Sequence, residues 1–523
     1  MQQDQRHVPG PIVTYCKRGV FKLWLAALVV MGMMAITQVA CAFTLLFDQS
    51  AYSGDVWVQV QDATQNFAAT YANGTQSLNF MDGGSRVLMS APVKLSDIGA
   101  GGLNITFSSG AIIFVFYDDP TGNSRTAAPD FNVSTQRFVP LELTMTGGAG
   151  DQGNLTAINY FTAPLSISSY QNNPSQNPGE PVLQQTGFGS ATAGQIGARF
   201  AAVTLGNPNA VVTNAQGQII RYLGPSNAFP GTNPWPSFIP YTQSINAASQ
   251  PTTILRTNSF NFYKMDKTTP DGPVYTFGTN MTATANADGS LTITGSITVT
   301  VTGAIKRGNP APPTGGAWTN AEFDFSVSDP NAFNNAIYGQ VQTSAVSFTG
   351  QAWNDFMTFT QTTLQDPSKP HDPVNNPSLY DNQVQANGLA GLNAYNTTIN
   401  MFIGEVTTGL LGGFFNSDYQ PGGVPPAIKN MTSSQWWSLN PIVAFSEIQP
   451  LNPYYNIYAQ VIFDTTNNTV YGVPYSDRFG NGPLVNSVQY NGTDVNYWVL
   501  GVGAPLPGTK ALSGMLLLQL LNN

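Results

Sequence analysis

One acidic side chain stands out in residues 138–166, because apolar and polar residues alternate around it. The order is Leu141, Glu142, Leu143, Thr144, Met145 and Thr146. This two-residue period predicts a strand with one buried face and one open face, and it puts Glu142 on the open face. A carboxyl there can donate or accept a proton, or bind a polar ligand. The alternative is an ordinary solvated surface glutamate.

The residues after this strand predict a hairpin. Glycines at positions 147, 148 and 150 supply the turn, and Pro164 ends the second arm. We expect that arm to run from Leu155 to Phe161, which would bring Asn159 beside the sheet that carries Glu142. The hairpin is therefore a candidate for an active site or for a binding surface.

Composition limits the class of protein. The 523 residues suffice for a sizeable core in two domains or in one two-lobed unit. Only 9% of the residues are charged, and the formal net charge is −9. An acidic chain repels phosphate backbones, so we expect no nucleic-acid partner.

Residues 1–42 predict a secretory signal peptide. Basic residues at 17, 18 and 22 precede an apolar run from Leu23 to Ile36, and Ala-Cys-Ala at 40–42 is a small-residue cleavage pattern. Cleavage near Ala42 would give a secreted or periplasmic protein. The apolar run is shorter than the ~20 residues that span a bilayer, so we expect no stable membrane anchor after cleavage.

Cysteine and histidine usage argues against a metal site. Cys16 and Cys41 both lie in the signal segment, so the mature chain would have no disulfide and no thiolate ligand. His7 lies in the same segment, and His371 stands in a proline-rich stretch as an expected loop histidine. We expect no metal and no cofactor.

Short alternating segments predict a mainly β protein. In the first part of the mature chain they include Arg86–Leu95, Leu103–Phe107 and Ala111–Tyr117, a spacing typical of an antiparallel barrel or sandwich. Further strands are predicted at Ala201–Leu205 and Gln218–Leu223. Residues 274–302 predict a hairpin that turns at Asp288-Gly289, and residues 454–480 predict one that turns at Asn467-Asn468.

Two later stretches have helical spacing instead. Their apolar positions are Trp353, Phe356, Met357, Thr360 and Leu364 in the first, and Leu389, Leu392, Tyr395, Ile399, Phe402 and Val406 in the second. Such stripes predict helices packed on a core. The apolar residues 515–521 are expected to dock as a strand or a short helix.

A proline-rich stretch at 225–243 carries Trp235, Phe238 and Tyr241. Aromatic rings on a loop suit stacking against the apolar face of a sugar. The alternative is that they pack on their own domain.

Three stretches together resemble one known family. They are RFVPLELTMT…NLTAINYFTAPLSIS from residue 137, IIRYLGPS from residue 219 and YAQVIFDTTNNTVYGVPYSDRFG from residue 458. In order and spacing they are similar to motifs of the family-64 glycoside hydrolases, the laminaripentaose-producing β-1,3-glucanases of the thaumatin-like superfamily. The resemblance extends over most of residues 43–505.

The resemblance implies a mainly β fold with two lobes. An N-terminal antiparallel β-barrel or sandwich would be joined to a mixed α/β lobe, with a wide groove for β-1,3-glucan between them. The corresponding division is a signal peptide at 1–42, the β part at 43–180, the α/β lobe with strands returning to the barrel at 181–505, and a tail at 506–523. We expect a monomer.

The resemblance also implies an inverting mechanism. Glu142 takes the position of the catalytic Glu, and Thr144 and Thr146 those of residues lining the sugar groove. Asp477 matches the second Asp of a Pro-Tyr-Asp-Asp motif, so it would contact sugar or fix a strand end. The expected catalytic Asp, however, is replaced by Asn159.

A neutral amide cannot serve as the base that inversion requires. Asn159 could orient a water, and other candidate bases are Asp118, Asp119, Asp130 and Asp151, each of which is otherwise a turn or loop carboxylate. The leading hypothesis is an exported hydrolase of β-1,3-glucan with Glu142 as general acid. The alternatives are a catalytically impaired protein that binds β-glucan or cell walls, and a secreted structural protein with an unused groove.

Overall fold

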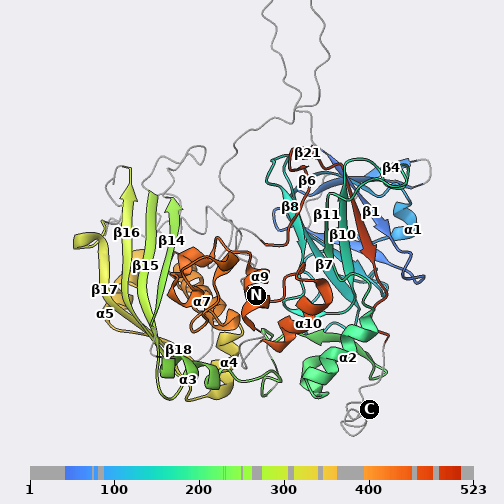
Figure 1. The fold of residues 1–523 in the computed structure, drawn as a ribbon. Helices are drawn as coiled ribbons and strands as arrows, with labels where there is room; N and C mark the ends of the chain where they lie inside the picture. Colours follow the sequence, from blue (N-terminus) through green and yellow to red (C-terminus); the bar gives the residue numbers. More distant parts are fainter. Residues whose placement is uncertain are drawn as a thin grey trace, which may run out of the picture.

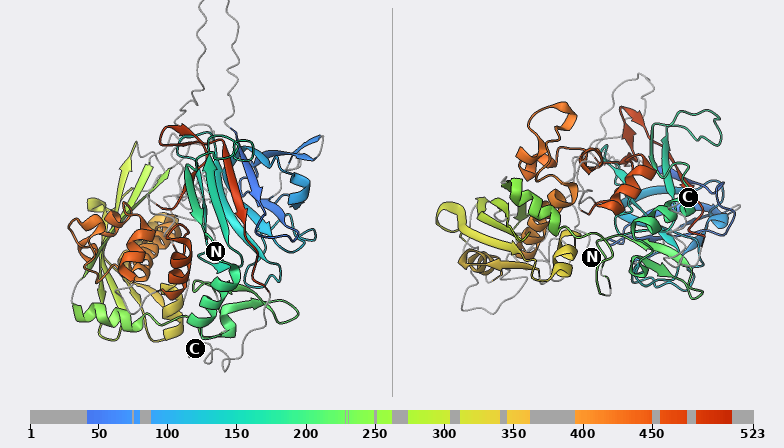
Figure 2. Two further views of the ribbon diagram at one scale, coloured as in Figure 1. Left: turned by 45° about the vertical axis from the view of Figure 1, so that its right-hand side comes forward. Right: turned by 60° about the horizontal axis from the view of Figure 1, so that its bottom comes forward.

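The structure is a computed structural model that describes residues 42–73, 76–79, 88–227, 229, 231–248, 251–261, 274–303, 311–339, 345–361, 394–449, 456–474 and 482–507. Its elements form a lobe built on a barrel-like sheet and a lobe of helices packed on a second sheet (Figures 1 and 2). A mainly β fold with a mixed second lobe is therefore confirmed. The predicted signal segment and the apolar residues 515–521 lie outside the described residues.

Twelve described strands form the barrel-like sheet. They are β1 (Phe43–Asp48), β2 (Trp57–Gln61), β3 (Ala68–Asn73), β4 (Gln76–Asn79), β5 (Val93–Lys94), β6 (Leu103–Phe116), β7 (Phe138–Met145), β8 (Gln152–Leu155), β10 (Leu165–Tyr170), β11 (Gln184–Gly187), β19 (Val485–Asn486) and β22 (Tyr497–Val502). The main path is β11-β10-β22-β1-β6-β7-β8-β19, with β2 and β3 both paired to β6. The β1–β22 pair is parallel, so the sheet is mixed where an antiparallel one was expected.

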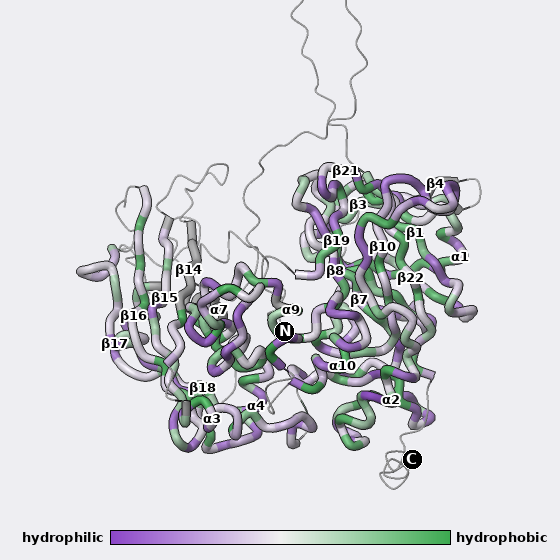
Figure 3. The backbone as a smooth tube through the Cα atoms, viewed as in Figure 1, coloured by the Kyte–Doolittle hydropathy of each residue, from purple (hydrophilic) through white to green (hydrophobic). Residues whose placement is uncertain are grey.

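The alternation seen in the sequence explains the core of this lobe. Leu141, Leu143 and Met145 on β7 are buried, and Trp498 on β22 packs against Phe43 on β1 with ring centroids 5.1 Å apart. Figure 3 shows hydrophobic segments along β10 and β22. The two ends of the strand path are joined through Gln184, whose amide accepts from Asn486 N at 2.9 Å and donates to the Leu484 carbonyl at 3.3 Å.

The second lobe is built on a five-stranded antiparallel sheet. Its strands are β14 (Thr252–Asn261), β15 (Val274–Ala285), β16 (Leu291–Thr302), β17 (Ala317–Phe325) and β18 (Val346–Thr349). The predicted hairpin at 274–302 is confirmed, since β15 and β16 pair along their whole length around Asp288-Gly289.

Helices complete the second lobe. They are α3 (Ile239–Ala248), α4 (Pro330–Ile337), α5 (Gln351–Gln361), α7 (Ala394–Gly412), α8 (Ser433–Trp436) and α9 (Pro441–Ile448). Helix α5 packs on β17, and α7 packs on β14. Both predicted helices are thus confirmed where they are described; Leu364, Leu389 and Leu392 lie outside the described residues.

The remaining elements lie with the barrel lobe. They are α1 (Leu95–Ile98), α2 (Ala193–Val203), α10 (Ile457–Thr466), the hairpin of β20 (Gln489–Tyr490) and β21 (Thr493–Asp494), and a small sheet of β12 (Val211–Thr213), β13 (Ile219–Leu223) and β9 (Tyr160–Phe161). The strand predicted at Gln218–Leu223 corresponds to β13. Among the described residues, no helix combines the length and the apolar character needed to cross a membrane.

Three strand predictions are wrong. Residues 201–203 end helix α2, which begins at a capping box formed by Thr192 and Gln195. Residues 457–466 form α10, and Asn467, at a φ of 50°, is its left-handed C-cap, where a hairpin turn was predicted. In the described part of the stretch predicted from residue 86 to 95, only the two-residue β5 is a strand before α1 begins.

Candidate active site

Glu142 is half-buried on β7, on the face opposite the buried Leu141 and Leu143. In register it lies between Ile112 on β6 and Asn154 on β8. The Asn154 amide donates a hydrogen bond from Nδ2 to Glu142 Oε2 at 3.1 Å. Asn154 is only 2% exposed, so the donor of this hydrogen bond is buried, whereas the carboxyl that accepts it is half-buried. Sequence analysis missed Asn154 because the second arm of the hairpin had been placed too late in the chain.

The hairpin turn is held by Asp151. Its carboxylate accepts the backbone N–H groups of Thr146, Gly147 and Gly148 and the hydroxyl of Thr146. These bonds satisfy backbone donors that have no strand partner in the six-residue connection between β7 and β8. They also bring β8 directly after the turn, so Gln152–Leu155 is the arm that pairs with β7.

Asn159 is not on the arm that pairs with β7, which corrects the predicted second arm. After Leu155 the chain leaves β7, and Asn159 is in a bend before β9, which pairs with β13. The Asn159 carbonyl accepts from Gly224 N at 2.7 Å, and its Oδ1 accepts from Ser226 Oγ at 3.2 Å. The residue directly across from Glu142 on the sheet is therefore Asn154.

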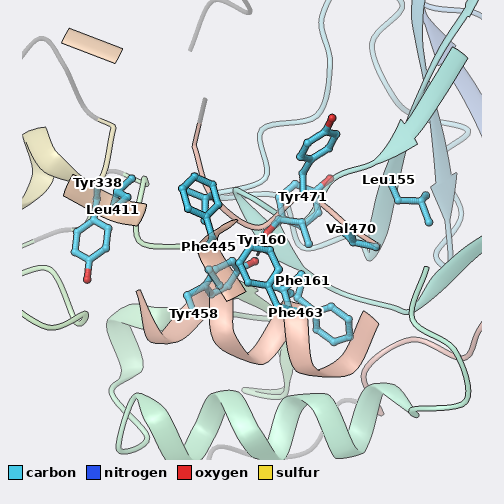
Figure 4. Close-up of a cluster of buried hydrophobic side chains, with 14 of the residues drawn as sticks. Leu155, Tyr160, Phe161, Tyr338, Leu411, Phe445, Tyr458, Phe463, Val470 and Tyr471 are labelled. Carbon is cyan, nitrogen blue, oxygen red and sulfur yellow. Dashed lines mark hydrogen bonds between the residues drawn. The ribbon is translucent and has the colours of Figure 1, made fainter. Parts of the chain in front are cut away.

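Aromatic packing supports the segment that carries Asn159. Tyr160 and Phe161 lie beside helix α10 (Figure 4), and the Tyr458 hydroxyl of that helix donates to the Ala157 carbonyl. Thr156 forms a parallel bridge with Tyr471. The bend at Asn159 is thus fixed from two sides.

The third sequence stretch approaches the same place. A Cβ atom on Gly339 would lie 3.3 Å from Pro474 Cβ and 3.8 Å from Ser226 Cβ, so Pro474 and Ser226 flank one point near Asn159. Asp477 follows Pro474 but lies outside the described residues. Its predicted sugar contact stays a prediction.

The other candidate carboxylates have local partners. Asp118 forms an ion pair with Arg137 at 2.7 Å, and this hydrogen bond raises the pKa of Arg137. Asp119 accepts from Thr121 N at 2.9 Å, and Asp130 from Asn132 N at 2.8 Å. Together with the turn bonds of Asp151, these contacts support the interpretation of all four as turn or loop carboxylates. No group of His, Cys, Asp and Glu in the described ranges could hold a metal.

The predicted sugar contacts differ from one another. Thr144 pairs with Ser109 on the face of Glu142 and is half-buried. Thr146 is exposed, but its hydroxyl donates to Asp151. Both remain predictions as groove residues.

The stacking role predicted for Trp235 is wrong in this structure. Trp235 is 4% exposed and packs edge-on against Tyr458, with ring centroids 5.3 Å apart. The loop turns inward because the Asn233 side chain accepts from Trp235 N at 3.1 Å. A buried indole has no free face for a sugar, so the alternative of packing on its own domain holds.

The sequence did not indicate a structural role for Arg221 on β13. Its buried guanidinium donates to the carbonyls of Phe131, Ser134 and Gln136, and it lies 4.4 Å from the ring centroid of Phe138 and 5.2 Å from that of Tyr160. Burial lowers the pKa of Arg221 to about 10. Arg221 thus connects the start of β7 to the segment that carries Asn159.

The described residues also form an open depression away from Glu142. It has a volume of about 370 Å³ and lies between β1, β22 and the loop after β10. Asparagine and glutamine side chains supply most of its lining. Glu142 is not part of it, so this depression does not define the candidate active site.

No protein-family model matches the sequence, and no curated protein does. Solved structures do match. A β-1,3-glucanase domain (GH64) from Clostridium beijerinckii is 13% identical, with 88% of this chain and 98% of that chain covered and a TM-score of 0.39. A laminaripentaose-producing β-1,3-glucanase in complex with laminaritetraose has the same identity and coverage and a TM-score of 0.41.

A third match is the GH64 laminaripentaose-producing β-1,3-glucanase from Paenibacillus barengoltzii complexed with laminarihexaose. It is 12% identical, with 88% of this chain and 74% of that chain covered and a TM-score of 0.38. These structures come from the family that the three sequence stretches resemble. At this level of likeness, the function of the chain has to come from the residues of its own site.

Proposed function

We propose that the protein is an exported glycoside hydrolase that cleaves β-1,3-glucan by inversion, with Glu142 as general acid. The observation that carries the proposal is the position of Glu142. It is a carboxyl on the face of the barrel sheet that does not enter the core, within the first of the three family-like stretches. Only 9% of the residues in the chain are charged. A half-buried acid on such a face therefore favours a functional role over an ordinary surface position.

In this mechanism Glu142 gives its proton to the glycosidic oxygen as the bond breaks. Water attacks the opposite face of the sugar ring, and a second group about 6.5–9.5 Å from Glu142 takes the proton of that water. Thr144 would contact the sugar from the same face, and Asp477 would contribute from the segment after Pro474. Asn159 would orient the attacking water, and the proton of that water would pass to another group.

The second candidate is a protein that binds β-1,3-glucan without cleaving it. The amide at position 159 favours it, because an amide has no basicity near neutral pH. The local partners of the four other candidate aspartates favour it as well.

One assay separates the two candidates. The mature protein is incubated with linear β-1,3-glucan, and released oligosaccharides are measured. We expect release, and we expect Glu142→Gln to reduce it at least a hundredfold, because a neutral amide cannot deliver a proton. Glu447→Gln is the control, since Glu447 is an exposed acid on α9.

A second variant tests position 159. If the base position is vacant, Asn159→Asp raises the rate of release at least tenfold, because it restores a carboxylate. Tight glucan binding without any release, unchanged in Glu142→Gln, would overturn the hydrolase proposal and support the binding protein.

A further inference from the structure

We propose that Asn154 is the positioning residue of Glu142. It fixes the plane of the Glu142 carboxyl by holding one of its two oxygens. This inference rests on the proposed role of Glu142. It concerns a residue that the sequence did not single out as a candidate catalytic or binding residue, and it follows from the pairing of β7 with β8.

The pairing of β7 with β8 brings the two side chains together. Residues directly opposite each other on antiparallel strands have Cβ atoms about 4.5–5.5 Å apart. Glu142 and Asn154 are such a pair, and Nδ2 of Asn154 lies 3.1 Å from Oε2 of Glu142. Because one oxygen is engaged by the amide, the two oxygens of the carboxyl are no longer equivalent, and a proton carried by the other oxygen has a defined direction.

The neighbouring glycine keeps the two strands in this register. A Cβ atom on Gly153 would lie 2.4 Å from the Glu142 carbonyl oxygen and 2.7 Å from Cη2 of Trp498. Only glycine therefore fits between β7 and the Trp498 indole. On its other side, Gly153 pairs with Val485 of β19. Asn154 is thus held on a rigid element, as precise orientation of a catalytic group requires.

The surroundings of Asn154 indicate that burying its amide costs stability. Asn154 is 2% exposed, and its Oδ1 has no hydrogen-bond partner within the described part of the chain. A buried amide with an unsatisfied oxygen costs free energy, and an apolar side chain of the same shape would avoid that cost. A residue that lowers the free energy of unfolding but contacts the candidate acid fits a trade-off between stability and activity.

Asn154→Leu tests the inference, because leucine has the same branched shape, although it is larger, and donates no hydrogen bond. We expect its Tm to equal or exceed that of the wild type, whereas kcat on linear β-1,3-glucan falls at least tenfold and KM changes less than twofold. In the Glu142→Gln background the same substitution should cause no further loss. Gln152→Leu, two residues earlier on the same face of β8, is the control and should leave kcat unchanged.

A second readout does not depend on catalysis. Carbodiimide modification of Glu142, followed by mass spectrometry of the peptide, should be at least threefold faster in Asn154→Leu, because the carboxyl has lost its bound amide. Asn154→Ala should show the same acceleration if the leucine variant does not fold. If the wild-type protein releases no sugar, the proposed function fails, and the modification rates still decide the role of Asn154. Unchanged modification rates, or a kcat that falls only together with Tm, would overturn the inference.

Discussion

At the scale of the residue, Arg221 makes several contacts that a substitution would leave unsatisfied. Arg221→Met would remove the hydrogen-bond donor of three partly buried carbonyl oxygens, at Phe131, Ser134 and Gln136, and would remove the cation above the ring of Phe138. Each unsatisfied acceptor costs about 1–3 kcal/mol, so the free energy of unfolding should fall by about 3 kcal/mol or more. Urea titration followed by circular dichroism measures it.

Arg199→Met is the matched control for this prediction. Arg199 forms an ion pair with Asp464, but both side chains are nearly half exposed. Exposed ion pairs contribute about 0–1 kcal/mol. An Arg221→Met variant as stable as Arg199→Met would show that water reaches and satisfies the three carbonyls.

The residues of the candidate site were predictable in part. The alternation around Glu142 correctly gives a strand with Leu141, Leu143 and Met145 in the core, because one buried face forces a two-residue period. The partner of Glu142 was not predictable in the same way. Register depends on where the turn closes, and Asp151 closes it early by accepting three backbone N–H groups, a role that its residue type alone does not reveal.

At the scale of the element, the β7–β8 hairpin depends on close approach at Gly153. Gly153→Ala should lower the free energy of unfolding by about 1–3 kcal/mol, because the added methyl overpacks the space between the Glu142 carbonyl and Trp498. Gly150→Ala in the turn of the same hairpin is the control. No heavy atom lies within 4 Å of a Cβ placed there, so we expect a change within about 0.5 kcal/mol. Equal urea midpoints for the two variants would contradict the proposed packing.

The elements that sequence analysis assigned wrongly share a physical cause. Residues 457–466 were expected as a strand but form α10, in which Tyr458, Ala459, Val461, Ile462 and Phe463 are all buried. A helix buried on several sides has no polar stripe, and a short apolar run then fits a strand equally well. Helices α5 and α7 were predicted correctly because their apolar positions recur at helical spacing.

At the scale of the whole molecule, the barrel lobe draws on chain segments far apart in the sequence. Strand β22 lies between β1 and β10, so the last described strand completes the barrel-like sheet begun by the first. Local patterns could predict the strand content of this sheet but not the parallel β1–β22 pair, because nothing in either strand encodes its partner across the chain. The fold of the barrel lobe therefore depends on the whole described length, and its stability should respond as one unit.

Buried tyrosines make that stability sensitive to alkaline pH. Burial raises the pKa of several tyrosines in both lobes, among them Tyr117, Tyr160, Tyr222, Tyr338 and Tyr458. In the unfolded chain a tyrosine loses its proton near pH 10, whereas in the folded protein these five keep theirs. Above pH 10 the unfolded state therefore binds fewer protons, and the free energy of unfolding falls by about 1.4 kcal/mol per pH unit for each tyrosine.

Arg221 acts in the opposite direction but does not cancel this effect. Its lowered pKa of about 10 means that the folded state releases a proton first, which offsets about one of the five tyrosines. We therefore expect urea midpoints to be stable from pH 8 to 9.5 and to fall steeply above pH 10, where a net loss of about 5 kcal/mol per pH unit approaches the whole stability of a typical domain.

Tyr222, whose pKa is raised to about 12, supplies the specific test. Tyr222→Phe should make the decline between pH 10 and 12 shallower by about 1.4 kcal/mol per pH unit, which is the contribution of one proton. Midpoints that stay constant up to pH 11.5 would contradict the burial of these phenols.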